Sequence, residues 1–211
     1  MSYAGKGRSS RLGSRHIPDS RVFVVMPSAL YSPSMILKTG VSASRKNYMA
    51  EKVLELLTGN VAESYTNAAM EWGTATEPEA RQIFEAETGF IVEEQGFILL
   101  NDSVGCSPDG FIGLDEGLEI KCPNSATHLE TLLAGEMPST HDGQVQGSLW
   151  ITGRKRWHFV SYDPRFPEPL RLFHCVIERD EKYIAMLAGE VEMFVTEMLD
   201  TVKQLRSRLN G

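Results

Sequence analysis

Apolar and polar residues alternate along the chain with two different periods. A helical period predicts helices between Ser44 and Gly59, over about 67–88, 125–134 and 140–152, and from Asp180 onward. Short β-rich runs separated by turn residues predict strands at about 90–92, 96–100, 111–113, 118–122, 156–162 and 171–178, with Val22–Met26 also extended. This order indicates an α/β fold, a single domain with a mixed central β-sheet flanked by helices.

Two details refine this picture. Gly73 and Pro78 interrupt the 67–88 stretch, so we expect a kink or two abutting helices there. The final stretch carries apolar residues on one face over seven turns, a stripe that suits either the core or a contact between subunits.

Charge is distributed unevenly over the 211 residues. The formal net charge is −7, from 21 Lys and Arg against 28 Asp and Glu. Residues 1–21 hold five basic residues and one acid, and we expect a flexible basic N-terminal arm there, followed by one domain over 22–211. The stretch 77–142 holds fourteen acids against Arg81 and Lys121 alone. Net acidity argues against nucleic-acid binding, so this concentration of acids needs another explanation.

Several classes of protein are excluded by what the sequence lacks. There is no apolar run long enough to span a membrane and no secretory signal. The three cysteines are widely spaced, which excludes a disulfide framework and a cysteine metal site and suits the cytoplasm. No phosphate-binding glycine loop, nucleophile elbow or paired histidine spacing occurs.

The informative segment is Pro108-Asp109-Gly110, followed nine residues later by Glu119-Ile120-Lys121. Side chains alternate faces along a strand, so Glu119 and Lys121 project together, and a strand pair can bring Asp109 beside Glu119. Two adjacent carboxylates repel each other unless a cation neutralises them, and oxygen ligands select Mg²⁺, with Mn²⁺ as a substitute. The main-chain carbonyl of Ile120 is a candidate further ligand. Lys121 can orient or deprotonate a water that attacks a phosphodiester.

Each half of this pattern is common by chance, because Glu–Lys pairs and Pro-Asp-Gly turns occur on many surfaces. The combination, with the strand–turn–strand spacing and apolar anchors at Leu118 and Ile120, is the pattern of PD-(D/E)xK nucleases, whose core is restriction-endonuclease-like.

From about residue 66 to 200 the sequence also resembles the phage-lambda-type (alkaline) exonuclease family. The resemblance rests on ordered matches at 69–73, 106–110, 117–123, 144–146, 162–165 and 176–183. It implies that Asp109, Glu119 and the Ile120 carbonyl bind Mg²⁺, with two ions in each site, and that Lys121 positions the water.

The resemblance also implies roles for five further residues. Glu77 would be a third acid, although a solvated helix acid paired with Arg81 is its ordinary interpretation. Ser107 and Gln144 would line the site, and His141 is a weaker DNA contact. Gln146 is more simply an ordinary helix position. The family also uses a serine and an arginine to anchor a 5′-phosphate. Ser34 is the first candidate for the serine, and Ser42-Ala43-Ser44 is the rival. Arg21 is the one arginine within 16–44 that lies upstream of both.

These features imply a Mg²⁺-dependent 5′-to-3′ exonuclease on double-stranded DNA that releases mononucleotides and leaves a 3′ single strand. The family further implies a homotrimeric ring, double-stranded DNA ends as the partner, a single-strand annealing protein and a bacterial or phage origin. Two alternatives stay open. One is an endonuclease of the restriction or junction-resolving type on the same core, and the other is a non-catalytic scaffold that binds DNA ends.

Overall fold

Two strands with almost uninterrupted burial form the centre of the sheet. The computed structural model describes residues 24–25, 43–60 and 67–209. Strands β6 (Glu116–Lys121) and β7 (Arg156–Tyr162) pair in parallel, and every other pair in this sheet is antiparallel. The order is β2-β5-β6-β7-β8, where the outer members are β2 (Val92–Glu93), β5 (Gly110–Ile112) and β8 (Leu172–Glu178). The predicted mixed sheet is therefore confirmed.

A smaller three-stranded sheet lies beside the main one. It has the order β1-β4-β3, with β1 (Val24–Val25), β4 (Val104–Cys106) and β3 (Ile98–Leu99). Strand β4 is not predicted from the sequence, because the glycine at the centre of Val-Gly-Cys carries little strand propensity. Its glycine is required by packing: a Cβ on Gly105 would lie 2.5 Å from the ring of Phe97.

One face of the main sheet is covered by α3 (Ala68–Thr88). Asn67 caps its start by accepting a hydrogen bond from the Met70 amide, and Gly89 ends it with a φ of 73°. The predicted boundaries are confirmed, but two abutting helices are not found: one helix continues through Pro78. Its apolar side, with Ala80 and Phe84, packs on a cluster from β5, β6 and β7 that comprises Ile112, Leu118, Ile120, Val160 and Tyr162.

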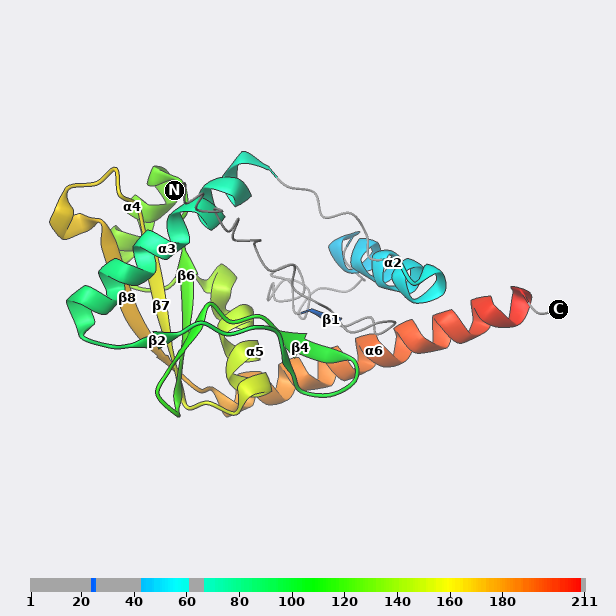
Figure 1. Cartoon of the computed structure of the whole chain (residues 1–211). Helices are drawn as coiled ribbons and strands as arrows, with labels where there is room; N and C mark the ends of the chain where they lie inside the picture. Colours follow the sequence, from blue (N-terminus) through cyan, green and yellow to red (C-terminus); the bar gives the residue numbers. More distant parts are fainter. Residues whose placement is uncertain (1–23, 26–42, 61–66, 210–211) are drawn as a thin grey trace, which may run out of the picture.

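The connection from β6 to β7 covers the opposite face. It contains α4 (Ser125–Ala134), the short 3₁₀ helix η2 (Ser139–His141) and α5 (Asp142–Thr152). Val145 and Leu149 of α5 pack against Trp157 and Phe159, which project from the face of β7 opposite to α3. The two parallel strands therefore carry helices on both sides, and their carboxyl ends lie at one edge of the sheet (Figure 1).

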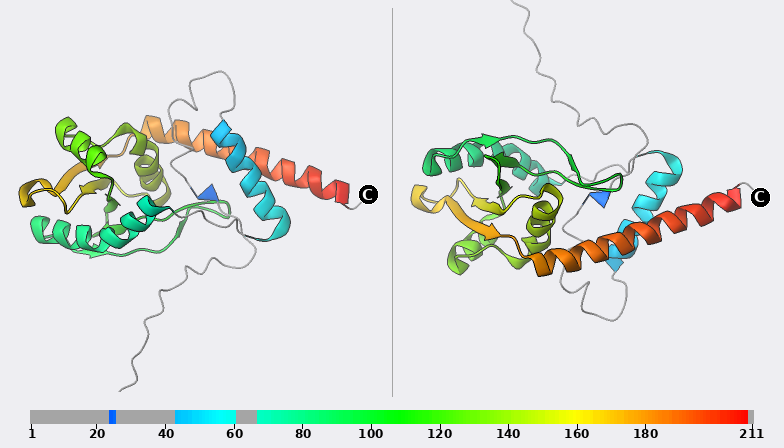
Figure 2. Two further views of the ribbon diagram at one scale, coloured as in Figure 1. Left: turned by 90° about the horizontal axis from the view of Figure 1, so that it is seen from above. Right: turned by 90° about the horizontal axis from the view of Figure 1, so that it is seen from below.

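The last helix, α6 (Glu181–Leu209), begins at a cap predicted from the sequence. Asp180 Oδ1 accepts hydrogen bonds from the amides of Lys182 and Tyr183. After a short 3₁₀ turn, η3 (Glu168–Leu170), β8 leads into this helix, which extends away from the sheet (Figure 2).

The apolar stripe of α6 is accounted for within the chain. Its first half packs against α5 and β4, and its second half packs against α2 (Ala43–Thr58), where Tyr48 and Val53 meet Phe194, Met198 and Val202. No helix within the described ranges is both long and apolar enough to cross a bilayer.

Candidate active site

The tight connection between β4 and β5 brings the first carboxylate to the central strand. Asp109 lies immediately before β5, and its Oδ2 accepts a hydrogen bond of 2.7 Å from the amide of Ile120. The Asp109 amide in turn donates to the carbonyl of Leu118 at 3.3 Å. These two bonds straddle Glu119, so Asp109 and Glu119 are neighbours, as the strand spacing predicts.

Glu119 and Lys121 share one face of β6, and α5 completes their surroundings. The Glu119 side chain is almost fully buried, and its Oε1 lies 2.5 Å from Lys121 Nζ. Gln144, in the first turn of α5, donates from Nε2 to the same Oε1 at 2.7 Å. The structure therefore places Gln144 against the candidate metal ligand. Gln146 faces elsewhere and bonds with the backbone of Glu178 and Asp180, which joins α5 to the start of α6.

The surroundings of Asp109 perturb its ionisation. Burial raises the pKa of Asp109, and the negative charge of Glu119 raises it further, against the lowering effect of the Ile120 amide, Lys121 and Arg81. For Lys121, burial alone would lower the pKa, but the hydrogen bond and charge of Glu119, together with the charges of Asp109 and Glu77, outweigh burial and raise it. Lys121 is therefore an ammonium group, and its single positive charge faces the carboxylates of Glu119, Asp109 and Glu77.

The oxygen atoms left over suit a hard divalent cation. Within the described part of the chain, Asp109 Oδ1 and Glu119 Oε2 make no hydrogen bond. No group of three or more His, Cys, Asp or Glu side chains suited to a metal ion occurs among these residues. Two carboxylate ligands therefore need a main-chain carbonyl, for which Ile120 is the candidate, together with water or substrate oxygens. Mg²⁺ accepts such a mixed oxygen shell.

The contacts of Glu77 agree with both interpretations of its sequence position, a helix acid paired with Arg81 and a third acid of the site. Its Oε1 accepts a bond of 2.7 Å from Arg81, the ordinary pair of residues four apart on a helix. Its charge also raises the pKa of Lys121, so it lies at the border of the same site. Arg81 holds Glu94 at 2.6 Å as well and acts on Asp109 electrostatically. Arg81 therefore links α3 to the loop after β2 through two ion pairs, and the sequence alone does not predict this link.

The structure describes only some of the remaining candidate residues. Burial lowers the pKa of His141 to about 4, and the positive charge of Lys121 adds to the shift, so the neutral imidazole lies near Lys121. Its Nδ1 is buried and lacks a hydrogen-bond partner among the described residues. Ser107 follows β4 directly and is partly buried. Ser34, Arg21 and the arm 1–21 lie outside the described residues, and Ser44 is exposed at the start of α2.

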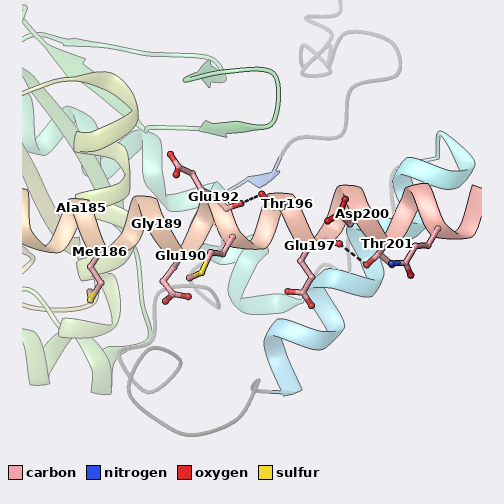
Figure 3. A pocket seen from close by; sticks show the side chains of 11 residues that line it. Ala185, Met186, Gly189, Glu190, Glu192, Thr196, Glu197, Asp200 and Thr201 are labelled. Atoms are coloured by element: carbon pink, nitrogen blue, oxygen red, sulfur yellow. Dashed lines mark hydrogen bonds between the residues drawn. The ribbon is translucent and has the colours of Figure 1, made fainter.

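A cavity of about 900 Å³ lies elsewhere, along α6 between Ala185 and Gln204. Figure 3 shows Glu190 and Glu197 projecting from this helix into the same region. Its described lining contains acids but no lysine or arginine, so it is poorly suited to a phosphate ligand. The candidate chemistry therefore belongs to the edge of the main sheet.

A mixed sheet that carries Glu119 and Lys121 on its central strand β6, with Asp109 bonded beside them from just before β5, has the arrangement of a PD-(D/E)xK nuclease. Comparisons with known proteins extend this assignment. Residues 33–155 match the family described as YqaJ-like viral recombinase domain. The chain belongs to this family.

Solved structures agree with the family. The alkaline exonuclease LHK-Exo of Laribacter hongkongensis, in complex with dAMP, is 37% identical over 90% of this chain and 94% of its own, with a TM-score of 0.80. A second structure of LHK-Exo is 39% identical over 87% and 91% of the two chains, with a TM-score of 0.78. A phage-related exonuclease of Haemophilus somnus 129PT shares the fold at 16% identity and a TM-score of 0.65, over 91% and 97% of the two chains.

A shorter relative is the uncharacterized protein ExoD of Escherichia coli K12. It is 37% identical over 67 residues, which are 32% of this chain and 76% of ExoD. The family match and the two LHK-Exo structures support a nuclease of the exonuclease type.

Proposed function

We propose that this nuclease is a Mg²⁺-dependent 5′-to-3′ exonuclease on double-stranded DNA. The observation that carries the proposal is the pair of partly buried Asp109 and almost fully buried Glu119, with Lys121 bonded to Glu119. Burial and mutual repulsion make this pair costly without a cation, and a stable fold retains such a pair when a ligand compensates it.

Each residue of the site has a proposed role. Asp109, Glu119 and the Ile120 carbonyl hold Mg²⁺, and Glu77 serves a second ion or its water. Bound Mg²⁺ supplies Lewis-acid polarisation of the phosphate and lowers the pKa of water. Lys121, as an ammonium, orients the attacking water and offsets charge that develops on the phosphate. Gln144 fixes the rotamer of Glu119 through its 2.7 Å bond, while Ser107 and His141 line the path of the scissile strand.

A solved relative supports a proposal for the products. LHK-Exo binds dAMP, a nucleoside monophosphate. A relative that binds a mononucleotide supports release of 5′-mononucleotides here, which would leave a 3′ single strand for recombination. We further propose a homotrimer that encircles the duplex and a single-strand annealing protein that receives the new strand. Mass photometry of the purified protein tests the trimer directly, and a monomer at micromolar concentration would contradict it.

The central test is a digest of linear duplex DNA with 5′-phosphate ends, in Mg²⁺ and in EDTA. We expect acid-soluble mononucleotides from the 5′ end in Mg²⁺ only, and no release by Asp109→Asn or Lys121→Met. Covalently closed circular duplex is the matched control substrate. Cleavage of the circle would support an endonuclease instead, and metal-independent binding without turnover would support a scaffold.

A further inference from the structure

An arginine at the edge of the candidate site is held in a fixed orientation by several contacts, although its side chain is half exposed. Arg165 lies three residues after the end of β7, and its side chain is 49% exposed. It belongs to no role derived so far. The inference below rests on the proposed function, because it names a further group that contacts the same DNA.

Three contacts fix the guanidinium of Arg165. Its Nε donates to Asp163 Oδ1 at 2.7 Å and its Nη2 donates to Asp163 Oδ2 at 2.9 Å, a fork on one carboxylate. Asp163 itself is fully buried and also accepts a bond of 2.8 Å from Ser125. The flat face of the guanidinium lies 4.7 Å from the ring centre of Trp72. The side chain is therefore clamped on one edge and one face.

The opposite edge of the guanidinium is available. An arginine has five N–H groups, of which two are used by Asp163. A third points toward the carbonyl of Pro123 at 3.5 Å, and Nη1 makes no hydrogen bond within the described part of the chain. The two N–H groups of Nη1 are therefore left to donate to the oxygens of a phosphate.

The position of Arg165 places this edge beside the candidate catalytic residues. Pro123 follows Lys121 by two residues, so the Arg165–Pro123 contact lies at the carboxyl end of β6. Trp72 precedes Glu77 by five residues on α3, which is about 7.5 Å along a helix. In open α/β sheets ligands bind outside the carboxyl ends of the strands, and Arg165 lies at that edge.

Charge supplies the second argument. The acidic stretch 77–142 contains only Arg81 and Lys121 as strong bases, and both contact carboxylates: Arg81 holds Glu77 and Glu94, and Lys121 holds Glu119. A strand of DNA that enters this edge needs a cation from outside the stretch. Arg165 provides one from the segment after β7.

We propose that Arg165 is a substrate-binding residue that contacts a backbone phosphate of the substrate strand next to the scissile one. Asp163 and Trp72 hold its guanidinium ready for that contact. Because binding then needs no reordering of the side chain, the contact contributes to affinity and to alignment of the strand.

The test compares Arg165→Gln with Arg156→Gln. Arg156 is also 49% exposed and also bonds a carboxylate, Glu116 at 2.6 Å, but it begins β7 and so lies at the opposite edge of the sheet. Both variants lose one positive charge. Binding to a labelled, 5′-phosphorylated duplex is measured by fluorescence anisotropy in EDTA over a series of salt concentrations, and KM and kcat are measured in Mg²⁺.

For Arg165→Gln we expect roughly tenfold weaker binding, since a charge-assisted hydrogen bond is lost. We also expect a slope of log affinity against log salt that is smaller by about 0.9, which corresponds to one phosphate contact. KM should rise while kcat is largely kept. Arg156→Gln should keep the wild-type slope. Arg165→Lys, which preserves the ion pair with Asp163 and therefore the fold, should recover part of the affinity but not all of it.

Two outcomes overturn the inference while leaving the nuclease in place. One is a wild-type salt slope and KM for both Arg165→Gln and Arg165→Lys, in a wild-type protein that digests DNA. The other is an equal loss for Arg156→Gln, which would show a general charge effect. If the wild type neither binds nor digests duplex DNA, the proposed function fails first and this inference fails with it.

Discussion

Asp163 is the buried carboxylate whose contribution to stability can be worked out most directly. Its side chain is fully buried, and it accepts hydrogen bonds from Ser125 and from both the backbone and the side chain of Arg165. Burial alone would raise the pKa of Asp163, but these hydrogen bonds and the adjacent positive charge outweigh it and hold the pKa at about 2. We predict that Asp163→Asn destabilises the protein in a pH-dependent manner.

The magnitude follows from the shift. A pKa that falls from 3.8 to about 2 corresponds to about 2.5 kcal/mol at 1.36 kcal/mol per unit. Because Arg165 is half exposed, solvent screens part of this attraction, and we expect about 1–2 kcal/mol. The folded-state pKa lies below the unfolded one, so this stability is present above about pH 4 and is lost as the pH falls through 2.

The assay is urea unfolding of Asp163→Asn and wild type at pH 7 and pH 3. The difference in unfolding free energy should be about 1–2 kcal/mol at pH 7 and roughly half as large at pH 3. Asp115→Asn is the control, because Asp115 also bonds a base, Lys155 at 2.8 Å, but both partners are exposed. Its effect should be too small to measure. An equal loss for Asp163→Asn at both pH values, or a loss as large for Asp115→Asn, would refute this account.

Three other variants probe the site and its scaffold. Asp109→Asn should abolish Mg²⁺-dependent nucleotide release. It should also raise the melting temperature in EDTA at pH 8, measured by differential scanning fluorimetry, because it removes a negative charge that burial and Glu119 disfavour. Gln144→Ala should lower the apparent Mg²⁺ affinity roughly 10- to 100-fold in a metal titration of activity, because Glu119 loses a bond of 2.7 Å; an unchanged titration midpoint would rule this out. Gly117→Ala should cost about 3 kcal/mol in urea unfolding, since its Cβ would lie 2.2 Å from the buried ring of Trp157, and a wild-type midpoint would contradict the packing argument.

Much of the fold could be predicted because the local signals agree with the tertiary structure. The boundaries of α4 and β7 match the predicted ranges 125–134 and 156–162, where caps, turns and hydrophobic period all point to the same element. Strand β4 could not be predicted, because Gly105 is placed there by the ring of Phe97 and not by strand propensity. Helix α3 continues through Pro78 because its packing on the sheet outweighs the local cost.

The candidate site divides in the same way. Alternation along β6 predicts that Glu119 and Lys121 share a face, and the short spacing to Asp109 predicts its approach. The contact between Gln144 and Glu119 joins residues 25 positions apart across a helical connection, so periodicity alone could not predict it. Arg165 is visible in the sequence only as part of Asp-Pro-Arg. Its orientation depends on Trp72, which lies on a different element far away in the sequence.

The acidic charge that first argued against a DNA-binding protein now has a partial physical account. In the 77–142 stretch, Asp109 and Glu119 form the pair that we propose binds Mg²⁺, and Arg81 and Lys121 both form ion pairs with carboxylates. A cation bound by Asp109 and Glu119 would convert this part of the surface from one that repels phosphate to one that binds it. Affinity for DNA would then depend on Mg²⁺ and on a few placed cations such as Arg165, and not on a broad basic surface. Such weak, local attraction would suit the proposed exonuclease, which would advance along its substrate after each cleavage, since many phosphate contacts would hold it in place.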